Sequence, residues 1–585
     1  MSETMFLYRS RKDGGWGVQP NDLTLTVTPG DGKATIGWTG KRKTVIDGQT
    51  VSEIYRVAVV RNEDHIPEDE NDGTTIFVSG NNTASYEDTG LTSGKTYYYN
   101  VFPYSKHNVY NRNCEGASVT PSEAAIVTIT FNCNNPIGST MTAKKGTNSV
   151  SAEIKQLATG SGAYATFSLA ETGDWDISGV TVNVPTLGNS VSKKGHVYGY
   201  KWLLPPAEAD TESQITYPDD VDNASFSGVP DVTSTDKNLD LGDWEDFFTN
   251  FVGARPVMLN FDGTVATELD HSDQTKNLDG TASKIADSST TQNAMVELQK
   301  RYMKRTASDG YGNFWLSEFK LSDDYSADPW LYGTTRATAT EMDVIYLPMF
   351  EGSNVSSKLR SIAGQTPINS TTGDTERRYA KALGAGWDID DYGDFMYISD
   401  LMLMAGKSTD VQRHWGYGHY NGGSSASSLH ATGSLKAVGP FYGGTNNTNM
   451  KFLWLENWYG DRWERTLGCY LVNGVIYVKS FGPYTVDGTV TNYTNLGHGI
   501  GGTNGGYISE VTYGKDGWAA KTASGATGKY LPDGAWFAGG TTVLFRGGGC
   551  YTGLLCGLTY ALNDPWSYSN WNVGASPTFK KASAA

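Results

Sequence analysis

The sequence predicts a mainly β, multi-domain protein with an α+β head in its C-terminal part. The length indicates several domains, because 585 residues are about four times the usual size of one domain. Glycine is abundant at 69 residues and aromatic residues make up 12% of the chain, whereas charged residues make up only 19%. Short stretches that alternate apolar and polar residues, separated by Gly- and Asn-rich turns, are typical of β-strands.

The charge balance and the cysteines exclude several classes of protein. The formal net charge is −17, and phosphate binding needs clustered basic residues, so we expect no nucleic-acid partner. No apolar run approaches the roughly 18 residues of a membrane span, and residues 1–20 lack the apolar stretch of a signal peptide. We therefore expect no membrane insertion and no export through a signal peptide. An odd number of widely spaced cysteines is not a disulfide framework: Cys114, Cys133, Cys469, Cys550 and Cys556.

Residues 21–123 predict a string of short strands. LTLTVTP, KATIGWT and SEIYRVAVVRN alternate at period two, and KTYYYNVFPYS follows the turn-rich LTSG. Trp38 on an early strand and Tyr97, Tyr98 and Tyr99 on a late strand resemble the fibronectin type III pattern, in which such residues fill the core between two sheets. The resemblance implies a spacer or an adhesive bead.

Residues 124–194 predict a second, smaller β unit. IVTITFNCN, STMTAKKGTNSV and YATFSLAETGDWDISG indicate strands joined by Gly- and Asn-rich turns. GSTMTAKKG and ETGDWDIS resemble small β-sandwich spacers of phage tail proteins. Residues 1–20 would then be the segment that attaches the chain to other virion proteins.

Helices are predicted only in the part that follows. GDTERRYAKALG has Asp374 as a candidate N-cap and Gly384 as its stop. DDYGDFMYISDLMLMAG is expected to end before Gly406. Its apolar residues fall on one face: Phe395, Ile398, Met402 and Ala405. GDWEDFFTNFVG predicts a third, short helix within residues 242–253.

The C-terminal stretches carry a family resemblance. They are FLWLENWYGDRWERTLG, GGYISEVTYGKDGW, LPDGAWFAGGTTVLFRGGG and GLTYALNDPWSYSNWNVGASPTF. Their order resembles the C-type lectin fold in its formylglycine-generating-enzyme variant. The resemblance covers residues 341–585. Residues 195–340 resemble an upstream extension of the same head in phage tail-fibre and tail-tip proteins.

The enzymes of that family use paired cysteines or a His-rich iron site, and this sequence departs from both. Cys550 and Cys556 are six positions apart instead of forming a C-x4-C pattern, and the eight histidines show no ligand pair at i and i+4. His414 and His419 are interpreted as loop residues, with metal ligands as the alternative. Acidic runs such as DDYGD are interpreted as turns or helix caps, with calcium ligands as the alternative. We therefore expect no catalytic residue, no metal ligand and no cofactor.

The segment 546–574 resembles the variable region of proteins diversified by retroelements, including phage tropism determinants. The resemblance implies a fixed scaffold: Arg546, Gly547, Gly548, Gly557, Trp571, Asn572 and Gly574. Between these positions lie side chains of unrelated chemistry, which are expected to form an exposed binding face: Cys550, Tyr551, Thr552, Leu554, Leu555, Thr559, Tyr560, Leu562, Trp566, Tyr568 and Ser569. Tyr551, Tyr560, Trp566 and Tyr568 would be the aromatic anchors.

These expectations combine into a receptor-binding protein of a phage tail fibre or tail tip, without enzymatic activity. The expected partners are a protein or glycan on the bacterial surface and other tail proteins. The expected location is the virion, and the resemblance implies a homotrimer. One alternative is an enzyme, either of the formylglycine-generating type or a glycan depolymerase. The other is a bacterial adhesin of fixed specificity.

Overall fold

The computed structural model describes residues 7–9, 16–18, 20–46, 49–80, 83–106, 108–158, 162–204, 210–233, 236–499, 505–523 and 529–581. The protein is mainly β and has several sheets. It forms two compact units, residues 1–130 with 137–155 and 164–194, and residues 131–136 with 156–163 and 195–585. The predicted attachment segment, residues 1–20, lies outside the described residues except for β1 (Leu7–Arg9), β2 (Trp16–Val18) and residue 20. No helix in the described ranges is both long and apolar enough to cross a membrane.

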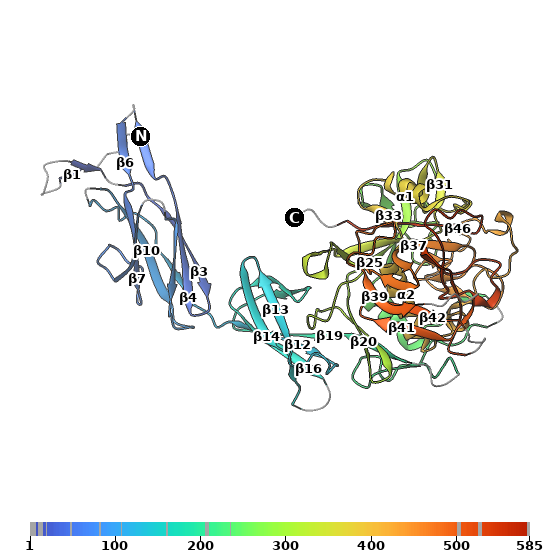
Figure 1. Cartoon of the computed structure of the whole chain (residues 1–585). Helices are drawn as coiled ribbons and strands as arrows, with labels where there is room; N and C mark the ends of the chain where they lie inside the picture. The colour runs from blue at the N-terminus through green and yellow to red at the C-terminus, as the bar shows by residue number, and fades with distance from the viewer. Residues whose placement is uncertain are drawn as a thin grey trace. The chain divides into compact units, whose positions relative to one another are not determined.

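The first unit begins with two packed sheets (Figure 1). One sheet consists of β3 (Thr24–Gly30), β4 (Lys33–Thr39) and β9 (Ser85–Thr89), and the other of β11 (Ala117–Val119), β10 (Tyr97–Tyr104), β7 (Arg56–Asn62) and β8 (Thr74–Gly80). A short hairpin of β5 (Lys43–Ile46) and β6 (Gln49–Glu53) lies between β4 and β7 in the sequence. Alternation of buried and exposed residues along β4 places Trp38 in a core cluster with Tyr97 and Tyr99.

Two further four-stranded sheets follow. Their strand orders are β15-β16-β12-β19 and β14-β13-β17-β18. The strands are β12 (Ala125–Phe131), β13 (Thr140–Lys145), β14 (Asn148–Glu153), β15 (Lys155–Gln156), β16 (Ala163–Leu169), β17 (Gly173–Ile177), β18 (Val180–Val184) and β19 (Ser190–Gly195). Buried side chains alternate along β16 and β17, and Trp175 is almost fully buried.

The second unit contains a six-stranded sheet that joins distant parts of the sequence. Its order is β24 (Val265–Glu268), β23 (Arg255–Asn260), β25 (Gln292–Gln299), β30 (Val344–Pro348), β47 (Pro577–Phe579) and β33 (Trp387–Ile389). Strands from the predicted extension, residues 195–340, therefore share a sheet with strands from residues 341–585. The two stretches belong to the same compact unit.

An eight-stranded sheet carries the C-terminal sequence motifs. Its order is β39 (Thr494–Gly499), β38 (Val475–Val478), β37 (Trp463–Val472), β44 (Thr541–Arg546), β45 (Tyr560–Asp564), β43 (Leu531–Phe537) and β40 (Gly506–Ile508), with β46 (Val573–Gly574) parallel to β37. One four-stranded sheet consists of β20 (Val197–Leu203), β21 (Ile215–Thr216), β26 (Tyr302–Ser308) and β27 (Tyr311–Ser317). Another consists of β22 (Lys237–Asn238), β34 (Tyr442–Gly443), β35 (Lys451–Phe452) and β36 (Leu455–Glu456). Three strand pairs are separate: β28 (Leu331–Tyr332) with β29 (Thr340–Glu341), β31 (Ser353–Val355) with β32 (Lys358–Arg360), and β41 (Glu510–Gly514) with β42 (Gly517–Thr522).

Among the described residues, the second unit has three α-helices: α1 (Gly373–Lys381), α2 (Tyr392–Gly406) and α3 (Val411–Trp415). Helices α1 and α2 are labelled in Figure 1. Short helical turns are η1 (Gly242–Trp244), η2 (Phe247–Val252), η3 (Arg336–Thr338), η4 (Ala426–Ser428) and η5 (Gly553–Leu555). The predicted cap of α1 is corrected, because Thr372 and not Asp374 accepts the hydrogen bond of the N-cap. Gly406 is the last residue of α2 instead of following it, and Lys407 takes the left-handed conformation.

Helix α2 is the interior element of this unit. Every one of its residues is buried, so the predicted single apolar face is part of a helix that is enclosed all round. It packs against β37 and β42. Asp391 caps its N-terminus by accepting a hydrogen bond from the Asp394 amide. Asp400 in the middle of the helix forms a buried ion pair with Arg305 and accepts a hydrogen bond from Tyr200.

Candidate functional site

The predicted variable region, residues 546–574, consists of two connections that flank one strand. It leaves the eight-stranded sheet at the end of β44, returns as β45 and leaves again before β46. Residues 547–559 form the first connection, called here the upper loop, which contains η5. Residues 565–572 form the second connection, called here the lower loop. Side chains of the two loops are therefore the ones that can reach a partner.

Arg546 fixes the start of the upper loop. Its guanidinium donates two hydrogen bonds to Asp390 Oδ2, at 3.0 and 2.6 Å, and one to the carbonyl of Trp458 at 2.7 Å. It also lies 3.8 Å from the centroid of the Trp458 ring. Because both charges are buried and paired, loss of either partner would leave an uncompensated charge in the interior. This scaffold residue ties β44 to the segment that precedes α2.

The predicted scaffold glycines lie where a side chain has no room. Gly547, Gly548 and Gly557 have φ values of 86°, 74° and 121°, which L-residues rarely adopt. A Cβ atom at Gly557 would lie 2.1 Å from Asp533, and one at Gly574 would lie 1.4 Å from the Arg462 guanidinium. The backbone of the region is therefore held by close approaches that only glycine permits.

Four residues predicted to be exposed are buried: Cys550, Thr559, Tyr560 and Leu562. Thr559 donates a hydrogen bond to the carbonyl of Leu555 at 2.5 Å, and the Tyr560 hydroxyl lies 2.6 Å from Cys469 Sγ. Leu562 belongs to β45, which is interior at its first three residues. The prediction of an exposed position is wrong for all four: Tyr560 and Leu562 lie on the buried part of β45, whereas Cys550 and Thr559 are buried within the upper loop. Because Tyr560 is buried, the prediction that it is an aromatic anchor of the face is also wrong.

The other seven predicted face residues reach the surface. Tyr551 and Leu554 are 40% and 42% exposed and Ser569 is exposed. Thr552, Leu555, Trp566 and Tyr568 are half-buried. Of the scaffold residues Asn572 is buried, whereas Trp571 is half-buried and its ring centroid lies 5.4 Å from that of Tyr551.

Trp566 is held more firmly than a surface anchor. Its Nε1 donates to Asp374 Oδ1 at 2.8 Å, and its ring lies against Gly373 at the start of α1. The Arg465 guanidinium lies 5.5 Å from its ring centroid and donates to its carbonyl at 3.0 Å. The side chain therefore joins the lower loop to α1.

A hollow of about 190 Å³ lies between the two loops. Tyr551 and Tyr568 from the loops line it together with Trp463, Trp536 and Phe545 from the sheet. Polar side chains complete the lining: Thr552, Asn563, Asp564 and Asn572. Trp463 and Trp536 meet edge to face, with centroids 5.5 Å apart, and Trp463 donates to the Tyr551 hydroxyl at 2.8 Å. Burial raises the pKa of Asp564. We call this feature the aromatic hollow.

Sequence reasoning missed the walls of the aromatic hollow. Trp463, Trp536 and Phe545 lie on β37, β43 and β44, outside the predicted variable region, residues 546–574. The signal that was available is the tryptophan in each of the stretches DRWERTLG and LPDGAWF. Trp463 is buried and Trp536 is half-buried, and the edge of an aromatic ring in either setting can line a hollow.

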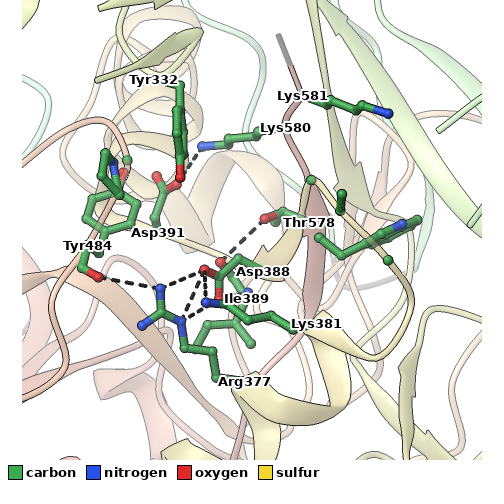
Figure 2. Close-up of a pocket in the computed structure, with 16 residues that line it drawn as sticks. Tyr332, Arg377, Lys381, Asp388, Ile389, Asp391, Tyr484, Thr578, Lys580 and Lys581 are labelled. Carbon is green, nitrogen blue, oxygen red and sulfur yellow. Dashed lines mark hydrogen bonds and ion pairs between the residues drawn. The ribbon is translucent and has the colours of Figure 1, made fainter. Parts of the chain in front are cut away.

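Figure 2 shows a second hollow, of about 910 Å³, at the start of α2. Arg377 of α1 pairs with Asp388 of β33, at 2.8 Å between Nη2 and Oδ2. Lys580 lies 2.6 Å from Asp391 and 2.8 Å from Asp394. The volume would admit a small ligand. These charged groups already pair with one another, so they join α1, α2 and the segment after β47.

Three side chains of the metal-binding type meet beneath the upper loop. They are His419, His430 and Asp461. His414, the other histidine interpreted as a loop residue, belongs to α3, and its Nδ1 lies 2.7 Å from the carbonyl oxygen of Val229. Sequence spacing gave no sign of the group, because Asp461 comes from a different segment than the two histidines, which lie together between α3 and β34.

No protein-family model and no curated protein matches the sequence. Solved structures with a similar segment include pectate lyase PelI from Erwinia chrysanthemi, 20% identical over 19% of this chain and 31% of that chain, with a TM-score of 0.14. The same enzyme in complex with tetragalacturonic acid is 17% identical over 20% of this chain and 38% of that chain, also with a TM-score of 0.14. The chain thus spans about a third of the length of these structures. A likeness of this extent assigns no fold and no activity to the chain.

Proposed function

We propose that this chain is a receptor-binding protein of a phage tail fibre or tail tip. Its head would have a C-type lectin-like fold that resembles retroelement-diversified proteins, with residues 21–123 as a fibronectin type III-like bead and residues 124–194 as a spacer. The two sheets around Trp38 support the bead. The buried helix α2 and the parallel pairing of β46 with β37 support the head. The proposed partners are a protein or glycan of the bacterial surface and other virion proteins.

The observation that carries this proposal is the aromatic hollow between two loops on a rigid base. Aromatic side chains supply contact area at low cost in conformational entropy, and polar groups at the edge give hydrogen bonds. The hollow is smaller than the roughly 300–1,000 Å³ of small-molecule pockets, so it suits one sugar ring or one protruding side chain. The revised face consists of the seven accessible predicted residues together with Trp571 and Trp536.

Binding through one such hollow would be weak, and a homotrimer would multiply it. Three linked sites raise the effective concentration of the second and third contacts. Light scattering of the purified full chain measures the oligomeric state, and the expected result is the mass of three chains. A stable monomer would overturn the trimer while leaving the site proposal in place.

The cysteines do not support an enzyme of the formylglycine-generating type. Cys550 and Cys556 are both buried, and burial raises the pKa of each thiol to about 12. A catalytic cysteine needs the thiolate, which a lowered pKa provides. Adhesion therefore remains the function that we propose.

Leu554→Asp tests the site. Leu554 is exposed, so a carboxylate there disturbs the face without entering the core, and we expect binding to susceptible bacterial cells to fall about tenfold or more. Leu278→Asp is the matched control, because Leu278 is 58% exposed in the same unit and lies on neither the upper nor the lower loop. Flow cytometry of labelled full-length protein on a panel of bacterial strains gives the readout. Equal binding by Leu554→Asp and the control would refute the proposed face.

A further inference from the structure

We propose that His419, His430 and Asp461 bind a divalent transition-metal ion of the zinc class beneath the upper loop. One potential ligand atom from each residue lies within 4.8 Å of the other two. Two imidazole nitrogens and a carboxylate oxygen form a ligand set that suits zinc and its neighbours, not calcium or magnesium. This inference goes beyond receptor binding and does not depend on it.

Hydrogen bonds around His430 determine which of its nitrogens is available. The Asn449 amide donates to Glu456 Oε1 at 2.7 Å, and a carboxylate only accepts, so Asn449 presents its oxygen to His430 Nδ1 at 2.6 Å. Nδ1 therefore carries a hydrogen, and in the neutral ring Nε2 keeps the lone pair. A second-shell partner of this kind orients most metal-binding histidines.

His419 and Asp461 are joined by a single hydrogen. His419 Nδ1 and Asp461 Oδ1 lie 2.6 Å apart, and both side chains are buried. Ligand atoms on one tetrahedral ion lie about 3.3 Å apart, given metal–ligand bonds of about 2.0–2.1 Å. The ion would take the place of that hydrogen, the neutral His419 ring would carry its hydrogen on Nε2 instead, and the pair would widen. The two imidazole rings, whose centroids lie 3.6 Å apart, would tilt toward the ion.

The charges around Asp461 favour a cation. Asp461 Oδ2 is buried and has no hydrogen-bond partner among the described residues. Arg462, the next residue, pairs with both Glu351 and Glu464, so two buried carboxylates already share its guanidinium. A divalent ion would offset the negative charge of Asp461, because a buried charge without a compensating partner is costly.

The proposed metal site is accessible from solvent and is joined to the upper loop by hydrogen bonds. His430 is half-buried and residues 421–427 beside it are exposed, so an ion can enter from solvent. Asp461 accepts the amide of His430 on Oδ1, and its carbonyl accepts the amide of Cys550 at 2.8 Å. An ion at these residues would fix the segment that carries both histidines to the base of the upper loop.

Zinc binding by the full chain tests the proposal. After treatment with a chelator and desalting, isothermal titration with ZnCl₂ is expected to give one site per chain. His430→Ala is expected to weaken it by at least about tenfold. His271→Ala is the matched control, since His271 is 50% exposed and pairs with Glu268 outside the group. No saturable site, or unchanged affinity in His430→Ala, would overturn the proposal.

Asp461→Asn separates metal binding from folding. An asparagine keeps an oxygen for the His419 and His430 hydrogen bonds and removes one of the crowded carboxylates. The metal-free variant is therefore expected to melt no lower than the metal-free wild type. It should also lose the visible absorption bands that bound Co²⁺ gives in the wild type. Co²⁺ bands in the variant equal to those of the wild type would show that Asp461 is not a ligand.

Discussion

At the scale of single residues, Tyr551 and Tyr560 show how far residue type determines a role. Both were expected to be anchors, yet Tyr551 stands at the edge of the aromatic hollow while Tyr560 is buried on β45. The segment between Gly548 and Trp571 has the composition of a binding surface, and seven of its predicted face residues are accessible on the two loops. The prediction of exposure is wrong at Tyr560 and Leu562 because a strand that is buried on both faces shows no alternation to mark it.

Trp566→Ala gives a prediction at this scale. The change removes the hydrogen bond to Asp374, the packing on Gly373 and the contact with Arg465. We expect the free energy of unfolding to fall by about 1–3 kcal/mol. Urea denaturation measures it, with Ser569→Ala as the exposed control, expected within about 0.5 kcal/mol of the wild type. An unchanged midpoint for Trp566→Ala would instead make Trp566 a free surface anchor.

At the scale of elements, the strands of residues 24–39 and the helices α1 and α2 could be predicted because their signals are local. Period-two alternation marks β3 and β4, and a cap residue before an apolar run marks α2. The pairing of β33 with β47 could not be predicted, since the two strands are far apart in sequence and no turn joins them. The site depends on such pairings, so the sequence indicated the loops but not the walls of the hollow.

The N-terminus of α2 provides a prediction on pH. Burial and the neighbouring Asp391 raise the pKa of Asp394 to about 8, against the effect of Lys580. The folded state therefore binds a proton that the unfolded chain has released between pH about 4 and 8. This contribution to stability is fully present below pH about 4 and is lost as the pH rises through about 8.

Asp394→Asn tests that dependence, because an asparagine resembles the protonated acid. Between pH 5 and pH 8 the unfolding free energy of the wild type should fall relative to that of the variant, by at least about 1 kcal/mol. Urea denaturation of both proteins at the two pH values gives the comparison. Parallel pH profiles would contradict the raised pKa.

At the scale of the whole molecule, the second unit includes residues 131–136, which precede most of it in sequence. Phe131 and Phe319 meet edge to face, with centroids 5.6 Å apart, and a Cβ at Gly195 would collide with Phe131. A boundary placed at residue 195 from composition alone therefore separates side chains that pack together.

Two fragments test this extended boundary. We expect residues 195–585 to melt several degrees below residues 124–585, because the shorter fragment exposes the Phe319 surface. Differential scanning calorimetry of both fragments measures the transition of the head. Equal melting temperatures would mean that residues 131–136 are dispensable for the second unit.

The position of β47 has a consequence for biosynthesis. This strand, residues 577–579, lies between β30 and β33 inside the six-stranded sheet. Until it has emerged from the ribosome, β30 and β33 lack the neighbour that joins them, and the edges they expose are open to pairing with another nascent chain. Premature termination anywhere upstream would leave the sheet in two pieces. Every molecule that presents a completed six-stranded sheet has therefore also been translated through residues 546–574, the predicted variable region.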